Sequence, residues 1–234
     1  MWRARVFTLF PQMFPGPLGY SIAGRALHKG LWGLDVIDIK SFCRGYHNVD
    51  DKPYGGGAGM VLRADAVDRA LSSVMARGSK VIYVTPRGKP LTQARLRACV
   101  AEGGLAVVCG HYEGIDERVI EAWQMEEISI GDYVLSGGEM AAFVLIDGCV
   151  RLLSGVVGNP QSLQEESFAG GAEGNESLLE YPHYTQPACW QGRSVPEVLM
   201  GGNHQAIETW RREQAQALTQ KRRPDLLANK KRAK

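Results

Sequence analysis

The feature that most constrains this 234-residue chain is an alternation of short apolar runs with longer segments of helical periodicity. The runs are rich in β-branched residues and are bounded by turn residues, which is typical of strands. Strand, loop and helix in this repeated order predict an α/β fold with a largely parallel sheet. The predicted strands cover residues 5–10, 34–39, 80–85, 105–109 and 127–130.

Helical periodicity and capping residues place helices between and after these strands. Asp65, Thr92 and Asp116 stand where N-caps belong. From residue 155 to 176 the periodicity is lost in a Gly-, Ser- and Glu-rich stretch, which indicates a linker or mobile loop. We therefore expect a domain over 1–157, a flexible segment over 158–176, and a small helical domain over 177–234. The predicted helices cover 18–29, 64–76, 92–101, 116–123, 139–153 and 199–220.

The net charge of +2 is small for a nucleic-acid-binding protein, whose affinity rests on Lys and Arg meeting phosphates. The sum conceals three blocks, of +9 over residues 1–97, −14 over 98–210 and +7 over 211–234. Such blocks can interleave on a folded surface and contribute only to solubility. The charge pattern therefore permits a polyanionic partner without requiring one.

Five widely spaced cysteines with no C-x-x-C pair predict neither a disulfide framework nor a zinc knuckle. The apolar run after Arg5 is too short for a signal peptide, and no run approaches 18 apolar residues. These features predict a cytoplasmic protein in a reducing compartment, without membrane spans.

Glycine is over-represented, with 28 of 234 residues, and it gathers in two kinds of place. The tract DDKPYGGGAGM over 50–60 matches neither a P-loop nor a dinucleotide fingerprint, so it is either a structural turn or a ligand loop. A second group of glycines follows three successive strands, in YVTPRGKP, VVCGHYEG and ISIGDYVLSGGE. Ligands of parallel sheets bind at the carboxyl ends of strands, so these three loops predict a pocket.

Two further classes of chemistry have little support in the sequence. His111 and Glu113 stand in the predicted pocket, but no second His or Cys follows at metal-ligand spacing, so we expect no metal site. A G-x-S-x-G elbow is also absent from the sequence, which disfavours hydrolase chemistry.

Long motifs give the chain a specific resemblance. HNVDDKPYGGGAGM, CGHYEGIDER, SIGDYVLSGGE and EYPHYTQP together resemble the bacterial tRNA (guanine-N1)-methyltransferases, the TrmD family of the SPOUT superfamily, over nearly the whole chain. The resemblance implies an α/β domain with a deep trefoil knot that holds S-adenosylmethionine, and a small helical C-terminal domain. The implied cofactor residues are Tyr83, Pro86, Gly88, Gly110, Glu113, Ile130, Gly131, Asp132, Tyr133, Val134, Leu135, Gly137 and Gly138.

The implied reaction is methylation of N1 of guanosine 37 in tRNA, which follows the anticodon and is itself preceded by guanosine. N1 must lose a proton, and similar enzymes use an aspartate directly before Ser-Phe. This chain has Glu166 at that position, with Glu165 directly before it. A glutamate keeps the carboxylate and has one methylene group more than an aspartate. Arg151 matches the arginine that stabilises charge on guanine O6. Gln186 departs from the usual Tyr-Thr-Arg-Pro pattern, which puts one RNA or intersubunit contact in doubt.

The resemblance also implies partners: tRNA, and a second copy of the chain in a homodimer with a shared active site. Two alternatives stay open, a SPOUT ribose 2′-O-methyltransferase and a non-catalytic RNA-binding SPOUT protein. A divalent cation is compatible with both methyltransferase hypotheses, the guanine-N1 enzyme and the ribose 2′-O enzyme. By charge alone, the candidate phosphate contacts are Arg25, Lys29, Arg44, Lys52, Arg211, Arg212, Lys221, Arg222 and Arg223.

Overall fold

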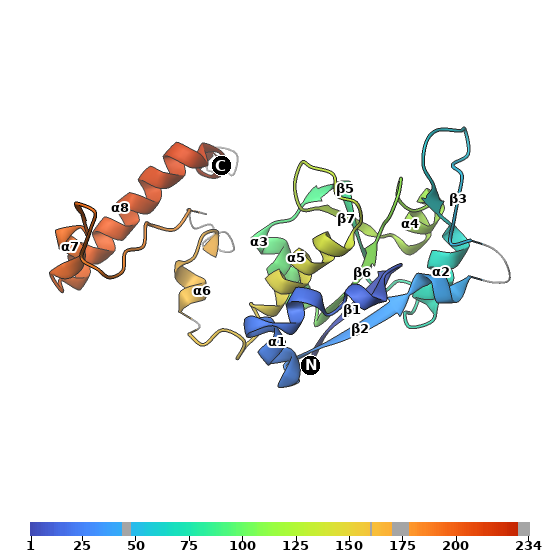
Figure 1. The fold of residues 1–234 in the computed structure, drawn as a ribbon, viewed down its shortest axis with the longest axis horizontal. Helices are drawn as coiled ribbons and strands as arrows, with labels where there is room; N and C mark the ends of the chain where they lie inside the picture. Colours follow the sequence, from blue (N-terminus) through green and yellow to red (C-terminus); the bar gives the residue numbers. More distant parts are fainter. Residues whose placement is uncertain (44–47, 160, 170–177, 229–234) are drawn as a thin grey trace. The chain divides into compact units, whose positions relative to one another are not determined.

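A computed structural model describes residues 1–43, 48–159, 161–169 and 178–228 of the chain. The chain divides into two compact units, Met1–Gly158 and Asn159–Lys234. Figure 1 shows the first unit as a sheet covered by helices and the second as a set of helices.

The first unit is built on a five-stranded parallel sheet with the order β2-β1-β6-β5-β7. Each strand coincides with one of the predicted apolar runs, and the bounds differ by a few residues. The prediction of an α/β fold with a parallel sheet is therefore confirmed. The strands are β1 (Trp2–Thr8), β2 (Trp32–Asp38), β5 (Ile82–Pro90), β6 (Gly104–Cys109) and β7 (Glu126–Ser129).

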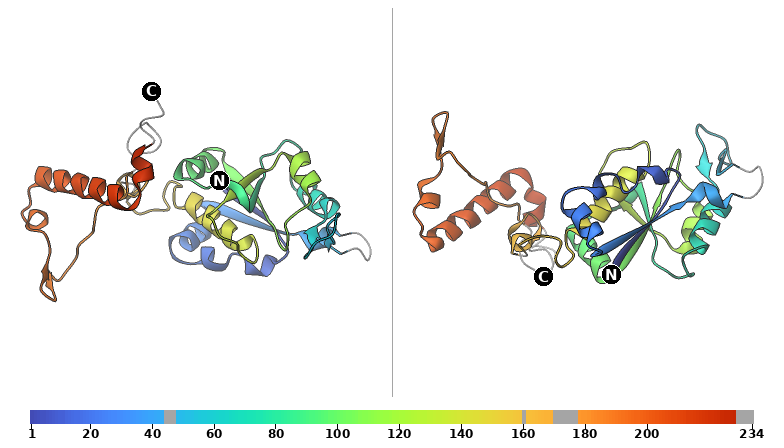
Figure 2. Two further views of the ribbon diagram at one scale, coloured as in Figure 1. Left: turned by 90° about the horizontal axis from the view of Figure 1, so that it is seen from above. Right: turned by 60° about the horizontal axis from the view of Figure 1, so that its bottom comes forward.

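Alternate side chains of the strands enter two hydrophobic cores, one on each face of the sheet. In β1, Ala4 and Val6 face one core, and Phe7 faces the other. The first core is closed by α1 (Ser21–His28), α3 (Gln93–Ala101) and α5 (Glu139–Val150). The second is closed by α2 (Ala64–Ser72) and α4 (Glu117–Trp123), so helices cover both faces (Figure 2). Burial on both faces explains why the strands read as continuous apolar runs.

Two of the three predicted N-caps are confirmed. Thr92 Oγ1 accepts a hydrogen bond from Arg95 N, and Asp116 does the same for Arg118 N. Asp65 is not an N-cap, because α2 begins at Ala64 and Asp65 lies within its first turn. Its carboxylate instead binds Arg63 and Arg69, whose hydrogen bonds lower the pKa of Asp65 to about 2.

The segment TPRGKP is part of β5 rather than a loop that follows it, so this expectation was wrong. Val84 and Lys89 both pair with Ile128 of β7, and the residues between them bulge out of the strand. At Gly88, an added Cβ would lie 2.4 Å from the backbone nitrogen of Ile128. The bulge therefore requires glycine at this position, for a close approach of two backbones.

The glycine tract over 50–60 lies in a hairpin between β3 (Asp50–Asp51) and β4 (Val61–Leu62). Glu113 N donates to Met60 O, and an added Cβ on Gly59 would lie 2.4 Å from Glu113 Oε1. Gly59 also has a φ of +81°, which favours glycine. Gly59, at least, therefore has a structural role, because it lets the tract pack closely against the loop that follows β6.

The described part of the second unit is mainly helical. The predicted helix over 199–220 corresponds to α8 (His204–Arg222), with a separate α7 (Glu197–Met200) before it and α9 (Pro224–Ala228) after it. Asn203 caps α8 through Ala206 N, and Gly202, with a φ of +68°, separates it from α7. A short hairpin pairs β8 (Cys189–Trp190) with β9 (Arg193–Ser194).

The stretch over 158–176, predicted as a flexible segment, contains a short helix, α6 (Ser162–Glu165). Four residues are too few for helical periodicity to be detected in a sequence. Residues 160 and 170–176 of this stretch lie outside the described residues. Within the described part of the chain, no helix is both long and apolar enough to cross a membrane.

Candidate functional site

A pocket of about 250 Å³ lies at the carboxyl ends of three neighbouring strands, β5, β6 and β7. It is formed by the bulge of β5, by the loop after β6 and by the loop between β7 and α5. The three glycine-bearing segments identified in the sequence thus come together. The structure brings eleven of the predicted cofactor residues into its lining: Tyr83, Pro86, Gly110, Glu113, Ile130, Gly131, Tyr133, Val134, Leu135, Gly137 and Gly138.

Two predicted cofactor residues do not line this pocket. Gly88 packs against the backbone of Ile128, and Asp132 lies exposed in the loop after β7. His111, which the sequence analysis placed in the pocket, does line it. The structure adds lining residues that the sequence reasoning missed, all of them close neighbours of predicted ones: Val84, Thr85, Tyr112, Gly114, Ile128, Ser129, Ser136 and Ala141.

Direct contacts between chain segments fix the shape of the pocket. Gly138 N donates to Gly110 O at 2.9 Å, which joins the segment before α5 to the loop after β6. An added Cβ on Gly138 would lie 2.8 Å from the Cα of Cys109, and one on Gly110 would lie 2.8 Å from the ring of Tyr83. These glycines therefore allow the loops to pack on one another, in addition to exposing backbone groups to the pocket.

The loop after β7 is internally braced and carries an apolar rim. Ser129 Oγ donates to Gly131 O at 3.0 Å, and Tyr133 N donates to the same carbonyl at 2.9 Å. Beyond this turn Tyr133, Val134 and Leu135 are 53%, 84% and 42% exposed. Exposed apolar side chains beside a polar backbone turn are typical of a ligand site.

Two groups near the pocket have notable electrostatic surroundings. Burial raises the pKa of the Tyr83 hydroxyl, so it stays protonated at neutral pH. Arg87, at the bulge of β5, binds Glu117 at 2.6 Å and Glu127 at 2.7 Å.

Among the residues that the structure describes, no three His, Cys, Asp or Glu side chains gather as a metal site would require.

The two predicted catalytic residues lie in different units. Arg151 directly follows α5 in the first unit, where its backbone N–H donates to Asp147 O at 3.0 Å. Glu166 directly follows α6 in the second unit and is half-buried.

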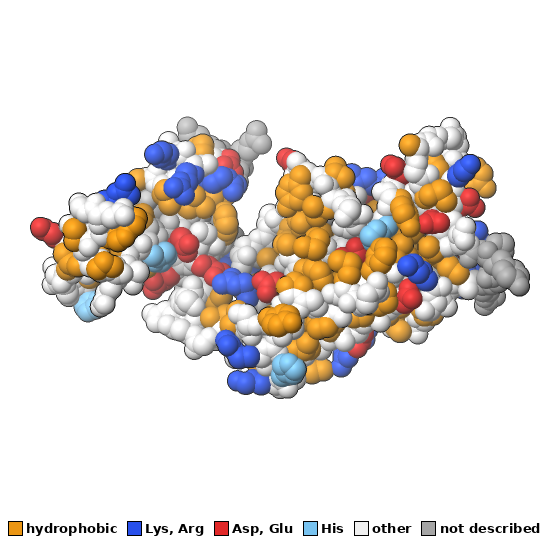
Figure 3. All heavy atoms as spheres, viewed as in Figure 1, with side chains coloured by type: hydrophobic (Ala, Val, Ile, Leu, Met, Phe, Trp, Pro, Cys, Tyr) orange, Lys and Arg blue, Asp and Glu red, His pale blue; other side chains and the backbone are white. Residues whose placement is uncertain are grey.

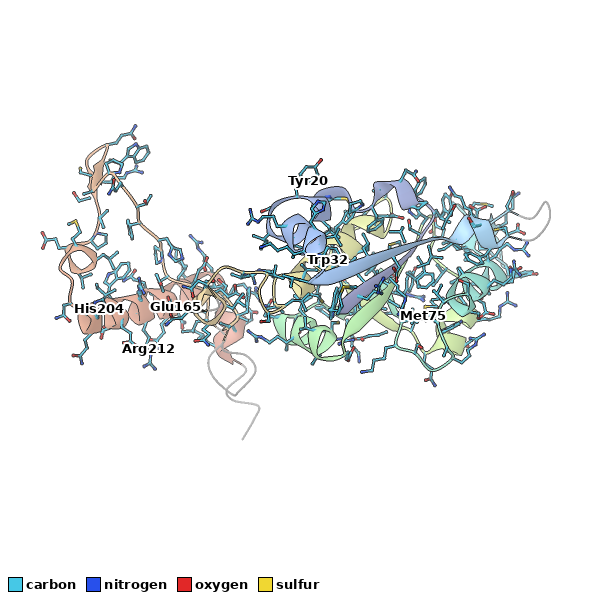
Figure 4. The ribbon with its side chains drawn as sticks, turned by 90° about the horizontal axis from the view of Figure 1, so that it is seen from below. Tyr20, Trp32, Met75, Glu165, His204 and Arg212 are labelled. Atoms are coloured by element: carbon cyan, nitrogen blue, oxygen red, sulfur yellow. The ribbon has the colours of Figure 1, made fainter. Side chains whose placement is uncertain are left out.

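Contacts on both sides of Glu166 anchor its segment within the second unit. Glu165 Oε2 accepts a hydrogen bond from the Tyr181 hydroxyl at 3.1 Å and lies 3.6 Å from Arg211 of α8. Figure 4 shows Glu165 beside this helix. On the other side, Ser167 Oγ accepts from Glu180 N at 3.1 Å. Glu165 thus binds Tyr181 and Arg211 within the second unit.

Lys and Arg side chains gather over α8, as Figure 3 shows. Two of the predicted phosphate contacts already bind acidic groups of the chain: Arg211 pairs with Glu165, and Arg223 pairs with Asp225 at 2.7 Å. Another candidate, Arg44, lies outside the described residues.

The family model described as "tRNA (Guanine-1)-methyltransferase TrmD" matches residues 2–229 of this chain. The chain belongs to this family. Its relatives include tRNA (guanine-N(1)-)-methyltransferases of Brucella canis, Brucella ovis and Brucella melitensis. Each is 57% identical to it over 226 residues, which cover 96% of this chain and 90% or 91% of the relative. The family resemblance predicted from the motifs is confirmed.

Within this methyltransferase family member, the pocket and the acid–base candidate have distinct chemical capacities. The pocket offers backbone donors and acceptors, an apolar rim and the Glu113 carboxylate, which suit a nucleoside with a cationic substituent. Glu166 offers a carboxylate for proton transfer, and Arg151 offers a fixed positive charge. The pocket lining and the two predicted catalytic residues thus lie on separate segments of the chain.

Proposed function

We propose that this tRNA (guanine-N1)-methyltransferase transfers a methyl group from S-adenosylmethionine to N1 of guanosine 37, where another guanosine precedes it. The observation that carries the proposal is the match to curated relatives at 57% identity over 96% of the chain. The pocket at the strand ends supports it, because methyl donors of this type need a site for adenosine and for a sulfonium.

The pocket residues fit S-adenosylmethionine. Ile130 and Leu135 offer apolar contacts for an adenine ring, and the backbone of the loop after β7 offers polar groups for its edge. Glu113 places a carboxylate in the lining, which is compatible with a cationic ligand. When bound, the cofactor supplies a methyl group on a positively charged sulfur.

Glu166 is proposed as the base that removes the N1 proton of the target guanine. Guanine N1 is a poor nucleophile while it carries this proton, so a positioned carboxylate accelerates the reaction. Glu166 directly precedes Ser167 and Phe168, the position that the base holds in similar enzymes. Glu165, whose carboxylate binds the Tyr181 hydroxyl and lies near Arg211, is the alternative by sequence position.

Arg151 is proposed to stabilise the negative charge that develops on guanine O6 as N1 loses its proton. A guanidinium stays charged at all physiological pH values and offers several donors in one plane. Its position directly after α5 places it in the first unit, which also holds the pocket.

The homodimer with a shared active site is part of the proposal. Met140 and Val144 of α5 are 52% and 50% exposed, and they share one helix face because they are four residues apart. Hydrophobic side chains gather on the face that carries α5 (Figure 3), and exposed Tyr20 points outward (Figure 4). Such an apolar surface supports an interface between copies of the chain.

Three further assignments complete the proposal. The first unit would carry the trefoil knot of the superfamily, which the match of the family model supports. The second unit, with its basic α8, would bind tRNA. A protein that modifies tRNA in this way would act in the cytoplasm.

One assay tests the proposal. The purified chain is incubated with methyl-labelled S-adenosylmethionine and unmodified tRNA that carries guanosine at positions 36 and 37, and the labelled nucleoside is identified by mass spectrometry. We expect 1-methylguanosine. Labelled 2′-O-methylguanosine would indicate a ribose methyltransferase, and tRNA binding without methyl transfer would indicate a non-catalytic protein.

A further inference from the structure

The first unit contains a buried carboxylate that the proposed reaction does not use. Glu139, the first residue of α5, is 2% exposed. Its Oε1 accepts a hydrogen bond from the Thr8 hydroxyl at 2.5 Å. Its two oxygens lie 2.9 and 2.8 Å from Nε2 of His111. An ionisable group is costly to bury unless it is hydrogen-bonded, so these contacts explain how Glu139 is tolerated.

The hydrogen-bond donors around Glu139 come from both of its neighbours. Thr8 Oγ1 accepts from Phe10 N at 2.9 Å and donates to Glu139. A carboxylate only accepts, so the contact with His111 requires the imidazole to carry its proton on Nε2. The N-terminus of α5 adds a favourable dipole for negative charge. The contacts thus have a consistent direction, with Thr8 and His111 as donors and the Glu139 carboxylate as acceptor.

This network connects three strand ends at the base of the pocket. Thr8 ends β1, His111 belongs to the loop after β6, and Glu139 follows the loop after β7. His111 forms a bridge with Gly137, and an added Cβ on Gly137 would lie 2.6 Å from His111 Nε2 and 2.7 Å from Glu139 Oε2. The neighbouring Gly138 N donates to Gly110 O. The network therefore lies directly against the backbone contacts that fix two of the three pocket loops.

We propose that Glu139, held by Thr8, positions His111 and thereby locks the loops at Gly110 and Gly137–138 in the conformation that binds S-adenosylmethionine. Glu139 is not in the pocket lining, whereas His111 is. Glu139 is accordingly a positioning residue that acts through its neighbour. The inference rests on the proposed function for the identity of the ligand, but the locking of the two loops is independent of it.

Three variants of the full chain separate this role from a general contribution to packing. Thr8→Val removes the hydroxyl at nearly constant volume, and Thr8→Ser keeps the hydroxyl and removes a methyl group. Glu139→Gln keeps the shape of the side chain but introduces a donor where His111 already donates. S-adenosylmethionine affinity is measured by calorimetry, and exchange of the Gly138 amide proton with solvent is measured by NMR.

We expect Glu139→Gln to raise the Kd for S-adenosylmethionine about tenfold, the size typical of one buried hydrogen bond left unmade. Thr8→Val should raise it several-fold, and Thr8→Ser should keep it near the wild-type value. The KM for the cofactor should follow the Kd, while the KM for tRNA stays constant. Faster exchange of the Gly138 amide should accompany each weakened variant.

Several results would overturn the inference. Wild-type affinity and wild-type Gly138 exchange in Thr8→Val would do so, and so would an equal loss in Thr8→Ser and Thr8→Val. If Glu139→Gln does not fold, the two Thr8 variants still test whether the network locks the loops. If the wild-type chain does not bind S-adenosylmethionine, the proposed function fails, and the Gly138 exchange rates alone decide whether the network locks the loops.

Discussion

The pocket of the first unit and the Glu166 segment of the second are built in different ways. The pocket is held by contacts between backbones, such as Gly138 N to Gly110 O, and by a buried side-chain network at its base. The Glu166 segment has one backbone contact of this kind, Phe168 N to Leu178 O, and is otherwise anchored through partly exposed side chains, among them Glu165 and Arg211 at 52% and 43%. Rigid backbone contacts suit a binding site, and exposed side-chain contacts can rearrange when a substrate arrives.

Cofactor binding and methyl transfer should therefore be separable by mutation in this enzyme. Changes at the pocket should affect cofactor affinity first, because they alter the shape of a pre-formed site. Changes at Glu166 should affect turnover and leave cofactor affinity intact.

Glu166→Gln should lower kcat by about a thousandfold, within the range for loss of a general base. The affinity for S-adenosylmethionine should stay at the wild-type value, because the pocket lies in the other unit. Single-turnover methylation and calorimetry measure the two quantities. The matched control is Glu165→Gln, for which we expect kcat within about threefold of wild type, because an exposed pair contributes little. A larger loss of kcat in Glu165→Gln than in Glu166→Gln would indicate that Glu165, and not Glu166, is the base.

Arg151→Lys should lower kcat by about a hundredfold, because an ammonium does not reproduce the planar donors that are proposed to stabilise charge on O6. Cofactor affinity should again be unchanged. The measurement is kcat with saturating cofactor and tRNA. A variant that loses tRNA affinity and keeps its kcat would show that Arg151 binds RNA and does not act on the reacting base.

Gly138→Ala should weaken cofactor affinity at least tenfold, because its Cβ would lie 2.8 Å from the Cα of Cys109 and 2.9 Å from Gly110 N. Overpacking against backbone forces the loops to shift. Gly158→Ala is the control, since an added Cβ there has no neighbour within 4 Å. Calorimetry measures the Kd for S-adenosylmethionine in both variants. Equal Kd values would show that the pocket is not as tightly packed as its contacts indicate.

The smallest expected effect concerns the basic helix of the second unit. Replacing Lys221 and Arg222 together with Gln should weaken tRNA binding and reduce the slope of log K against log salt by about one to two, if both meet phosphates. Arg223→Gln is the control, because Arg223 already binds Asp225. Filter binding over a series of salt concentrations measures the slopes. Cofactor affinity should not respond to either change.

The parts of the fold that depend on local pattern could be predicted from the sequence. The five strands followed from apolar runs, and the caps at Thr92 and Asp116 followed from residue type and position. The pocket could be predicted because parallel strands bring their carboxyl ends to one edge of the sheet. The family followed from long motifs, which local physics alone does not interpret.

The features that were missed depend on contacts between distant segments. The bulge of β5 arises from its double pairing with Ile128, some forty residues later, which no local pattern near Gly88 reveals. Glu139 and Thr8 are 131 residues apart in the sequence, so their hydrogen bond could not be anticipated. Asp65 was assigned as a cap because cap and first-turn positions favour the same acidic residues, and only the helix start at Ala64 distinguishes them.

Mixing two impaired variants tests the division between pocket and base most directly. At subsaturating S-adenosylmethionine, Gly138→Ala should keep at most about a tenth of wild-type activity, and Glu166→Gln about a thousandth, in the proposed homodimer. If the pocket of one subunit works with Glu166 of the other, the mixture should regain roughly a quarter of wild-type activity, since half the dimers are mixed and each has one intact site. A mixture that exchanges subunits and gains no activity over the two variants alone would contradict the shared active site.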